Sequence, residues 1–211
     1  MRPAPGVGRI DTDDFAARAR RAAAGDGAPE VGDFTINPDM ADWVRANATR
    51  EAAVLVGAVE RDGQAQLLLT ERTKALRTHS GQIAFPGGRI DAHDASPVAA
   101  AVRECEEETG IAARLIRPVG ELPVYLSGSG FRIHPVLAVI EGDPPMRANP
   151  HEVEAIFEVP LGFLMDQGNH RTVSRVWNGR RRLFYEMPYG ERRIWGLTAG
   201  IIRLLYERLY A

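Results

Sequence analysis

Four glutamates lie within five positions of the segment RECEEETGI, which runs from Arg103 to Ile111. In a helix, Glu104, Glu107 and Glu108 stand at i, i+3 and i+4 and share one face, whereas Glu106 points elsewhere. Carboxylates that converge in this way are the hard oxygen ligands that magnesium and manganese take. The spacing therefore predicts a divalent metal site on this helix, for Mg²⁺ or Mn²⁺.

A solvated acidic face is the alternative reading, because most runs of charge in proteins are of that kind. Two features favour the metal. Like charges at i and i+4 each cost roughly a few tenths of a kcal/mol. The cluster also lies near the C-terminal end of the expected helix, where the helix dipole opposes negative charge. A bound divalent cation removes both penalties.

The helix that carries the glutamates has clear signals at both ends. Ser96 is a good N-cap, Pro97 suits the first helical position, and Gly110 suits the position just past the end, so the helix is predicted from about Pro97 to Thr109. An apolar stripe at i, i+4 and i+7 is expected to pack on a sheet and to fix the carboxylates in place. Its members are Val98, Val102 and Cys105.

Two strands and a loop precede the helix. Ala52–Val59 and Ala65–Arg72 read as strands, and the Asp62-Gly63 pair between them is a strong hairpin signal, so we expect an antiparallel start to the sheet. Proline and glycine make Phe85–Asp94 a predicted loop. Its Gly-Gly pair permits close approach of the backbone to a phosphate or to the helix end, and a simple tight turn is the alternative.

Four further elements are expected after the helix. Arg132–Gly142 reads as a buried strand, Glu152–Met165 mixes strand and helix signals, and Arg181–Trp195 contains a hairpin. Gly196–Tyr210 is an amphipathic helix that closes the chain. Strands and helices alternate without a βαβ rhythm, so the predicted fold class is mixed α/β, of the α+β type.

The first 48 residues differ from the rest. An alanine- and arginine-rich helix is expected near Asp13–Ala24, followed by a stretch rich in glycine, proline and aspartate from Gly25 to Asp33. We therefore expect residues 1–48 to be a partly helical, looser extension and residues 49–211 to be the main domain. The extension is expected to pack either on its own core or on a second copy, in a homodimer.

Composition limits the classes of protein to consider. The 211 residues suffice for one domain with an appendage, and 45% apolar with 26% charged residues is typical of a folded soluble chain. No apolar run approaches the roughly 20 residues of a membrane helix, and the N-terminus lacks the apolar core of a signal peptide, so we expect a cytoplasmic protein. A net charge of -2 gives no reason to expect a nucleic-acid or membrane partner.

The segment GGRIDAHDASPVAAAVRECEEETGI resembles the Nudix box, G-x5-E-x7-R-E-U-x-E-E-x-G-U, in which U is aliphatic. Two departures occur: Asp94 stands where the box has glutamate, and eight residues rather than seven separate it from Arg103. Cys105 also replaces an aliphatic residue, a mild change because a buried thiol behaves as a small apolar group. The matching positions are Gly88, Arg103, Glu104, Glu107, Glu108, Gly110 and Ile111.

These departures look like the variant box of the coenzyme A pyrophosphatase branch of Nudix hydrolases. That branch carries a signature close to L-L-T-x-R-[SA]-x3-R-x3-G-x3-F-P-G-G, and LLTERTKALRTHSGQIAFPGG, residues 68–88, meets it except at Thr73. EVEAIFEVPLGFL and IWGLTA also look like segments of this branch. The resemblance extends from about Ala52 to Ile202.

The resemblance implies a Nudix fold, a mixed sheet between helices, and hydrolysis of a nucleoside diphosphate derivative. For this branch the substrate is coenzyme A or acyl-CoA, cut to adenosine 3',5'-bisphosphate and 4'-phosphopantetheine. Two alternatives are a Nudix pyrophosphatase for ADP-ribose, a dinucleotide, a nucleotide sugar or an NTP, and a Nudix-fold module that binds a nucleotide without cleaving it. Such binding modules tend to lose the box carboxylates, which this chain keeps.

Hydrolysis of a diphosphate requires charge neutralisation on the phosphates and an activated water, which a divalent ion supplies. We assign Glu104 and Glu108 as the principal ligands, and Glu107 as a further ligand or the carrier of a metal-bound water. Arg103 is expected to orient a carboxylate by a bidentate pair. The general base is expected to be Glu104 or Glu152. Glu152 is also a candidate ligand, and a charged residue that opens an edge strand is its alternative.

A phosphate-rich substrate also needs cations and backbone amides. The candidate substrate-binding residues are Arg72, Arg77, Gly87 and Gly88, with Arg89 behind them. A surface role is the alternative for each arginine. His79 and His134 are expected to be structural or peripheral, since nothing near them in the sequence completes a histidine-type metal site.

Overall fold

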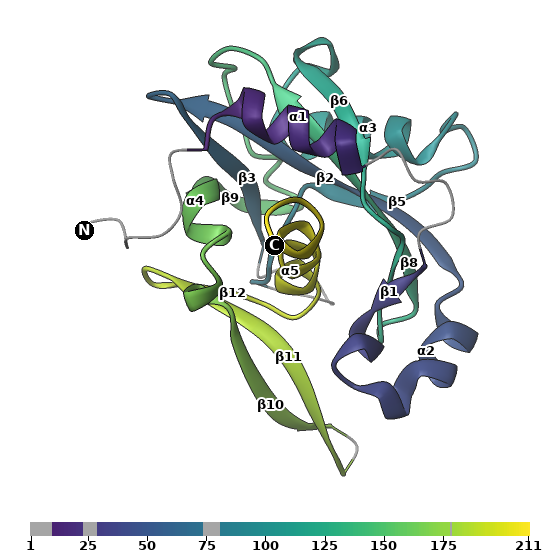
Figure 1. Cartoon of the computed structure of the whole chain (residues 1–211). Helices are drawn as coiled ribbons and strands as arrows, with labels where there is room; N and C mark the ends of the chain where they lie inside the picture. The colour runs from purple at the N-terminus through teal and green to yellow at the C-terminus, as the bar shows by residue number, and fades with distance from the viewer. Residues whose placement is uncertain (1–9, 23–28, 74–80, 178) are drawn as a thin grey trace.

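Figure 1 shows the computed structural model of the chain, which describes residues 10–22, 29–73, 81–177 and 179–211. Within these residues, nine strands form a mixed sheet in the order β1-β7-β8-β2-β3-β4, with β5 paired to β2, β6 to β8 and β9 to β3. The strands are β1 (Val31–Gly32), β2 (Arg50–Arg61), β3 (Gln64–Arg72), β4 (Ile83–Ala84), β5 (Gly87–Arg89), β6 (Ile116–Glu121), β7 (Tyr125–Leu126), β8 (Phe131–Ile140) and β9 (Val153–Pro160).

A second, antiparallel sheet extends away from the first in Figure 1. It consists of β10 (Arg171–Trp177), β11 (Arg180–Tyr189) and β12 (Arg192–Trp195). The helices are α1 (Thr12–Ala22), α2 (Ala41–Asn47), α3 (Pro97–Thr109), α4 (Leu161–Leu164) and α5 (Leu197–Leu209), with short 3-10 turns at Asp33–Thr35, Pro38–Met40, Ala113–Leu115 and Gln167–Asn169. The predicted α+β class is confirmed.

The main sheet has a layer of helix on each face. Side chains alternate along a strand, so neighbouring residues of β3 enter different cores. Leu67 packs in the cluster on the side of α1 and α5, and Leu68 packs in the cluster that contains Cys105 of α3. In Figure 1, α5 lies in front of the sheet, and the two clusters place α3 on its opposite face. The sheet is therefore a rigid base for α3.

The hairpin predicted at the Asp62-Gly63 pair is confirmed. It joins β2 to β3 in antiparallel register, with Arg61 opposite Gln64. Asp62 and Gly63 have φ of 50° and 67°, the pair of positive values that a two-residue hairpin turn needs. β2 also pairs in parallel with the whole of β8, which is the buried strand expected at Arg132–Gly142.

The predictions for the C-terminal half are confirmed as well. The segment with mixed signals holds both a strand, β9, and a short helix, α4. The predicted hairpin is β11–β12, which turns at Gly190, and the closing amphipathic helix is α5. No described helix is long and apolar enough to cross a membrane.

One local prediction is wrong. Gly87–Arg89, placed in a loop, forms β5 and pairs with Ala52–Val54 of β2, because the two glycines let the backbones meet without side-chain clashes. The apolar stripe of α3 packs on the sheet as predicted, with Cys105 fully buried and Val98 and Val102 partly buried against the same cluster. The buried residues of this helix are Ala100, Ala101, Cys105, Glu108 and Thr109.

α1 is part of the main core. Phe15 and Ala19 of this helix are fully buried, in the same cluster as residues of α5. Arg18 Nη1 donates to the carbonyl of Leu209 at 2.8 Å, which ties α1 to the end of α5. Of the two expectations for the extension, packing on its own core holds for residues 10–22. The homodimer contact and the domain boundary at residue 48 stay predictions.

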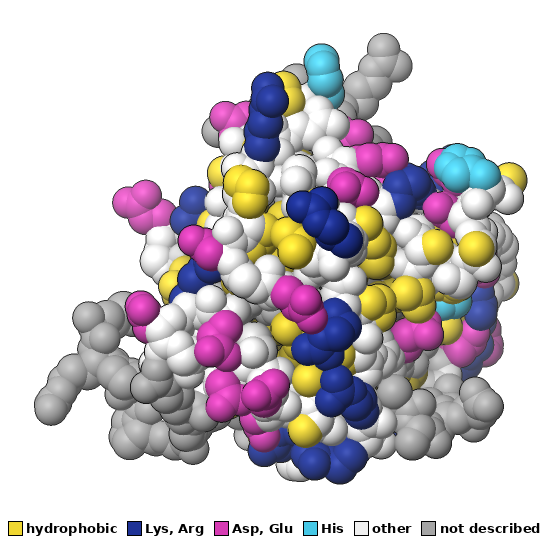
Figure 2. All heavy atoms as spheres, turned by 90° about the horizontal axis from the view of Figure 1, so that it is seen from above, with side chains coloured by type: hydrophobic (Ala, Val, Ile, Leu, Met, Phe, Trp, Pro, Cys, Tyr) yellow, Lys and Arg dark blue, Asp and Glu magenta, His cyan; other side chains and the backbone are white. Residues whose placement is uncertain are grey.

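The surface carries mixed charge. On the face shown in Figure 2, acidic and basic side chains lie interspersed among apolar ones. This pattern agrees with the small net charge of -2. No single sign of charge therefore dominates this face.

Candidate active site

The three glutamates predicted to share one face of α3 differ strongly in exposure. The side chain of Glu108 is 3% exposed, that of Glu104 is 16% exposed, and that of Glu107 is 55% exposed. The helix therefore presents a gradient from a buried carboxylate near the sheet to a solvated one. The helix is capped at both ends, which fixes its bounds and the positions of its side chains. Ser96 Oγ accepts from the amide of Ala99 at 3.1 Å, and Gly110 ends the helix with φ 72°.

Glu108 is a buried acid with an incomplete set of partners. Its Oε1 lies 3.5 Å from Arg72 Nη1, and its buried Oε2 has no hydrogen-bond partner. Burial, with the negative charges of Glu152 and Glu104, raises the pKa of Glu108 to about 8, against the lowering effects of Arg72 and of a hydrogen bond from the Gly87 backbone. Because an unpaired buried acceptor is costly, this oxygen marks a place where a cation would be stabilised.

Glu104 lies between the helix and the Gly-Gly pair. Its Oε1 accepts from Arg103 Nη1 at 2.9 Å, and burial raises the pKa of the carboxyl group. A Cβ at Gly88 would stand 2.5 Å from this carboxylate, and one at Gly87 would stand 2.4 Å from the carbonyl oxygen of Ala53. Close approach of the backbone, one of the two readings of the glycine pair, is therefore confirmed, and the partners are Glu104 and β2.

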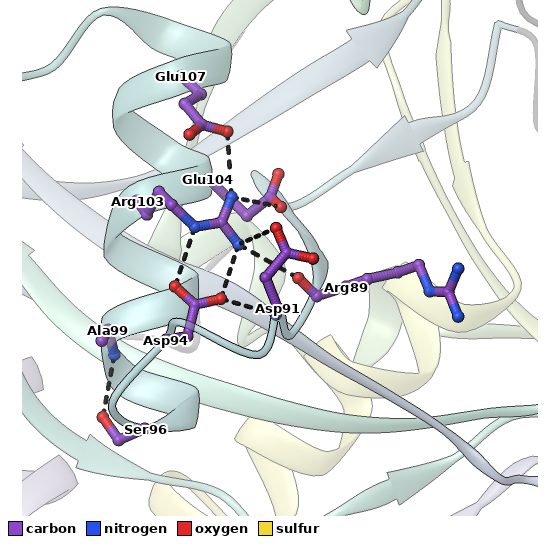
Figure 3. A network of polar contacts seen from close by, with 8 residues as sticks. All are labelled: Arg89, Asp91, Asp94, Ser96, Ala99, Arg103, Glu104 and Glu107. Atoms are coloured by element: carbon purple, nitrogen blue, oxygen red, sulfur yellow. Dashed lines mark hydrogen bonds and ion pairs between the residues drawn. The ribbon is translucent and has the colours of Figure 1, made fainter.

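Arg103 is the centre of the network in Figure 3. It forms a bidentate pair with Asp94, through Nε to Oδ1 at 3.0 Å and Nη2 to Oδ2 at 2.8 Å. Its Nη1 also donates to Glu104 at 2.9 Å and to Glu107 at 3.1 Å, and Nη2 donates to the carbonyl of Arg89 at 3.3 Å. The arginine therefore makes the contacts expected of a residue that orients carboxylates, and its role in catalysis stays a prediction.

Asp94 is a residue of the site that the sequence prediction missed, because it was treated only as a departure from the box. Its side chain is 4% exposed, and its bond to Arg103 lowers its pKa to about 2. A tight turn presents it, since Asp91 N donates to Asp94 Oδ2 at 2.8 Å and Asp94 N donates to Asp91 O at 3.0 Å. Aspartate is shorter than the glutamate of the box, and one extra residue separates it from Arg103. The carboxylate of Asp94 nevertheless reaches Arg103.

Glu152 lies beside the end of β3. Its carbonyl accepts from the amide of Thr73 at 2.9 Å, and its charge raises the pKa of both Glu104 and Glu108. The structure therefore brings Glu152 into electrostatic reach of the two carboxylates assigned as principal ligands.

The remaining candidates lie elsewhere. Arg77 and His79 are outside the described residues. His134 Nε2 lies 2.8 Å from a carboxylate oxygen of Glu51 at the surface, as expected of a peripheral histidine. Arg89 is exposed, and in Figure 3 its side chain points away from α3.

The described acidic residues have the carboxylate oxygens that a divalent cation binds, but their side chains are not already gathered around one point. Among the described residues, no three acidic, histidine or cysteine side chains stand close enough to form a ready-made metal cluster. Glu107, the third predicted ligand, is turned toward Arg103. The fit rests on the unpaired oxygen of Glu108 and on the negative charges of Glu104 and Glu152, which Arg72 alone does not balance.

A family model described as NUDIX domain matches residues 49–177, which include α3, the Gly-Gly pair and Glu152. The chain belongs to the Nudix family. It is therefore a Nudix-type diphosphatase that acts on nucleoside diphosphate derivatives, and Nudix hydrolases generally use divalent metal ions.

The relatives agree with this assignment. The chain is 43% identical over 156 residues to the uncharacterized Nudix hydrolase NudL of Escherichia coli (strain K12), across 74% of this chain and 81% of the relative. The same values hold for NudL of Shigella boydii serotype 4. Among solved structures, the NUDIX domain of Shewanella oneidensis NrtR, complexed with ADP ribose, is similar with a TM-score of 0.50 and 18% identity, over 77% of this chain and 89% of that one. That likeness supports the fold alone.

Proposed function

We propose that this Nudix hydrolase cleaves the diphosphate of coenzyme A or acyl-CoA, giving adenosine 3',5'-bisphosphate and (acyl-)4'-phosphopantetheine. One observation carries the proposal. The segment that resembles the coenzyme A branch, residues 68–88, forms the end of β3, β4 and the start of β5, and it supplies Arg72 beside Glu108 and Gly88 beside Glu104. This proximity of the signature to the glutamates of α3 supports the proposal.

Glu104 and Glu108 would hold the metal, with Glu107 or Glu152 as a further ligand. When bound, a divalent ion neutralises the phosphate oxygens and lowers the pKa of water. Arg72, which lies 3.5 Å from Glu108, would bind a non-bridging phosphate oxygen once a cation has taken over its role as partner of that carboxylate. Arg103, held by Asp94, keeps the Glu104 carboxylate in position beside Gly88.

The reaction needs a base as well as cations. A water oxygen forms a bond to one phosphorus, the P–O bond to the bridging oxygen breaks, and the second phosphate leaves with that oxygen. The proton of the water passes to a carboxylate, for which Glu152 and Glu104 are the candidates. The negative charge of Glu152 suits Glu104 to this exchange, because it helps to raise the pKa of the Glu104 carboxyl group.

Product analysis tests the proposal. Purified protein with magnesium or manganese should convert coenzyme A to phosphopantetheine and adenosine 3',5'-bisphosphate, and Glu108→Gln should not. ADP-ribose, a dinucleotide, a nucleotide sugar and an NTP serve as competing substrates. Higher kcat/KM for any of these than for coenzyme A and acetyl-CoA would replace the proposed substrate with that compound.

Three further expectations accompany this function. The cytoplasm stays the expected location. A homodimer and a domain boundary at residue 48 also remain predictions. Sedimentation of the full chain tests the first of these two, and limited proteolysis near residue 48 tests the second.

A further inference from the structure

The segment before β9 closes the C-terminal end of α3. The amide of Arg147 donates to the carbonyl of Thr109 at 2.7 Å, and the amide of Asn149 donates to the carbonyl of Glu108 at 3.0 Å. The last carbonyls of a helix have no partner within the helix, and these two bonds satisfy a pair of them. The segment therefore fastens to α3 at the residue that carries the buried carboxylate, three residues before it reaches Glu152.

Asn149 begins a tight turn that ends at Glu152. Its carbonyl accepts from the amide of Glu152 at 3.0 Å and from the amide of Val153 at 2.8 Å. Its side-chain Oδ1 also accepts from the amide of His151 at 3.1 Å, which makes an Asx turn inside the backbone turn. Pro150 follows Asn149, and its ring restricts φ to about −65° at the position where a turn favours proline. Side chain and ring thus restrict the turn beyond its backbone bonds.

A further bond ties Glu152 to the strand that carries Arg72. The carbonyl of Glu152 accepts from the amide of Thr73 at 2.9 Å, and Thr73 directly follows Arg72 at the end of β3. The side chain of Arg72 in turn lies 3.5 Å from the Glu108 carboxylate. The backbone of Glu152 is therefore held from two sides, by α3 through the turn and by β3 directly.

Glu108 and Glu152 come from different elements, α3 and the loop before β9, and their charges interact. The negative charge of Glu152 helps to raise the pKa of Glu108. Like charges repel, so attraction between the two side chains does not set the distance between them. The backbone has to set it, and the shortest described connection runs from the Glu108 carbonyl through Asn149 to the Glu152 amide.

We propose that Asn149 and Pro150 form a positioning turn, which holds the Glu152 carboxylate at a fixed place relative to Glu108. The inference rests on the proposed function for the role of Glu152 as base or ligand, and it does not depend on which diphosphate is the substrate. Asn149 acts through Glu152 and is not itself a catalytic residue. Displacement of a catalytic group by about 1 Å costs on the order of 10²-fold in rate, so a loosened turn lowers kcat.

Asn149→Ala tests the turn, because alanine removes Oδ1 and leaves the backbone bonds in place. With magnesium and coenzyme A, kcat should fall by about tenfold or more, and KM should stay within about twofold of wild type. Asn149→Ser retains an uncharged oxygen that can close the same turn more weakly, so it should recover most of the loss. Equal kcat in the alanine variant and the wild type would overturn the inference.

A second substitution distinguishes positioning from a general effect on the fold. Glu152→Gln removes the carboxylate on which the turn acts, and kcat should fall by about 10²-fold or more, the contribution of a general base. Adding Asn149→Ala to this variant should cause no further loss beyond about twofold, because the two residues act as one unit. If the two losses multiply, or if Glu152→Gln keeps full activity, Asn149 does not act through Glu152 and the inference fails.

Asp166→Ala is the matched control, because Asp166 begins a similar turn elsewhere in the molecule. Its Oδ1 accepts from the amide of Gly168 at 2.9 Å, and its carbonyl accepts from the amide of Asn169 at 3.0 Å. This turn follows α4, whose buried residues pack in the cluster on the face of the sheet opposite α3. The control should keep wild-type kcat. A loss of kcat as large as that of Asn149→Ala would show that loosening any such turn has this effect.

Hydrogen exchange of the metal-free protein gives a readout without turnover. The amides of His151 and Glu152 donate within the turn, so in Asn149→Ala they should exchange about tenfold faster than in wild type. Unchanged exchange of both amides would show that the side chain does not hold the turn, and it would overturn the inference.

The choice of substrate separates this inference from the proposed function. If coenzyme A is not cleaved and ADP-ribose, a dinucleotide, a nucleotide sugar or an NTP is, the proposed substrate fails. The same variants then test the turn with that compound. If coenzyme A is cleaved and Asn149→Ala matches Asp166→Ala, the inference fails and the proposed function stands.

Discussion

Two carboxylate clusters lie one turn apart on α3 and differ in how their charge is balanced. Around Arg103, one guanidinium serves Asp94, Glu104 and Glu107 with bonds of 2.8–3.1 Å, and the pKa of Asp94 falls to about 2. Around Glu108, Arg72 Nη1 lies 3.5 Å away, one carboxylate oxygen has no hydrogen-bond partner among the described residues, and burial raises the pKa to about 8. The first cluster is complete in the protein alone, and the second is not.

We infer from this difference that the cluster around Arg103 positions side chains and that the cluster around Glu108 binds a ligand. A satisfied network gains rigidity from its own bonds, and Asp94, which pairs with Arg103 through both of its oxygens, has no free valence for a ligand. Glu104 contacts Arg103 through Oε1 and can offer Oε2 to a cation. A buried acid without a full set of partners destabilises the protein, and a bound cation would offset that cost. We therefore expect changes near Glu108 to abolish turnover and changes near Asp94 to loosen the site.

The largest effect is expected for Glu108→Gln. The amide keeps the shape and removes the charge, so kcat should fall about 10³-fold or more, as for the loss of a metal ligand. The metal-free protein should become more stable near neutral pH, by about 2–4 °C in Tm for each kcal/mol recovered, because the buried carboxyl group no longer has to take up a proton on folding. Steady-state assays and calorimetric scans with EDTA measure the two effects.

Glu106→Gln is the matched control for that variant. Glu106 is exposed on the same helix, and its side chain accepts from the amide of Ala113 at 3.2 Å. Its kcat should stay within about twofold of wild type. Equal losses in the two variants would mean that general acidity of the helix matters and that the buried position of Glu108 does not.

Gly88→Ala should have the next largest effect. A Cβ at this position would stand 2.5 Å from the Glu104 carboxylate, which must move. Displacement of a catalytic group by about 1 Å costs on the order of 10²-fold in rate. The protein should stay folded, because the obstacle is the end of a flexible side chain. Rate assays with circular dichroism as the control check this, and wild-type activity in the alanine variant would contradict the close contact.

Asp94→Asn should cost less, about tenfold in kcat/KM, since it loosens Arg103 without removing a ligand. Its stability profile provides a second readout. The folded pKa of Asp94, about 2, lies below its ordinary value of 3.8, so its contribution is present above pH 3.8 and lost as pH falls toward 2. Acid unfolding of the asparagine variant should therefore depend less on pH in that window. If acid unfolding of the asparagine variant depends on pH as strongly as that of the wild type, the pair of Asp94 with Arg103 does not stabilise the fold.

The smallest effect concerns the stability of the metal-free wild type. The folded pKa of Glu108 is about 8, above its ordinary 4.5, so the protein is most stabilised below pH 4.5 and loses that contribution as pH rises through 8. Tm in EDTA should fall by a few degrees across this window. Magnesium should reverse the fall, and Glu108→Gln should flatten it. A profile that rises from pH 5 to 8 in EDTA would contradict the burial of this acid.

Local signals explain which parts of the fold could be predicted. Ser96, Pro97 and Gly110 each act within one turn of chain, so the bounds of α3 could be read without knowing the rest of the fold. The hairpin at Asp62-Gly63 is local in the same sense. Periodicity likewise sufficed for α5, whose apolar residues face one core.

What depended on long-range packing could not be predicted. The spacing placed Glu108 on one face with Glu104 and Glu107, and the tilt of α3 on the sheet then buried Glu108 and left Glu107 in solvent. The role of Asp94 depends on the turn at Asp91, which no pattern specified. The burial of Phe15 in the main core depends on contacts with α5, nearly 190 residues further along.

Binding of Mn²⁺ measured by electron paramagnetic resonance tests the central claim most directly, because it needs no substrate. Wild-type protein near neutral pH should bind manganese ions, Glu108→Gln should lose most of this binding, and Glu106→Gln should keep it. Equal binding by all three proteins, or none by the wild type in the presence or absence of coenzyme A, would contradict the assignment of the buried carboxylate as the metal ligand.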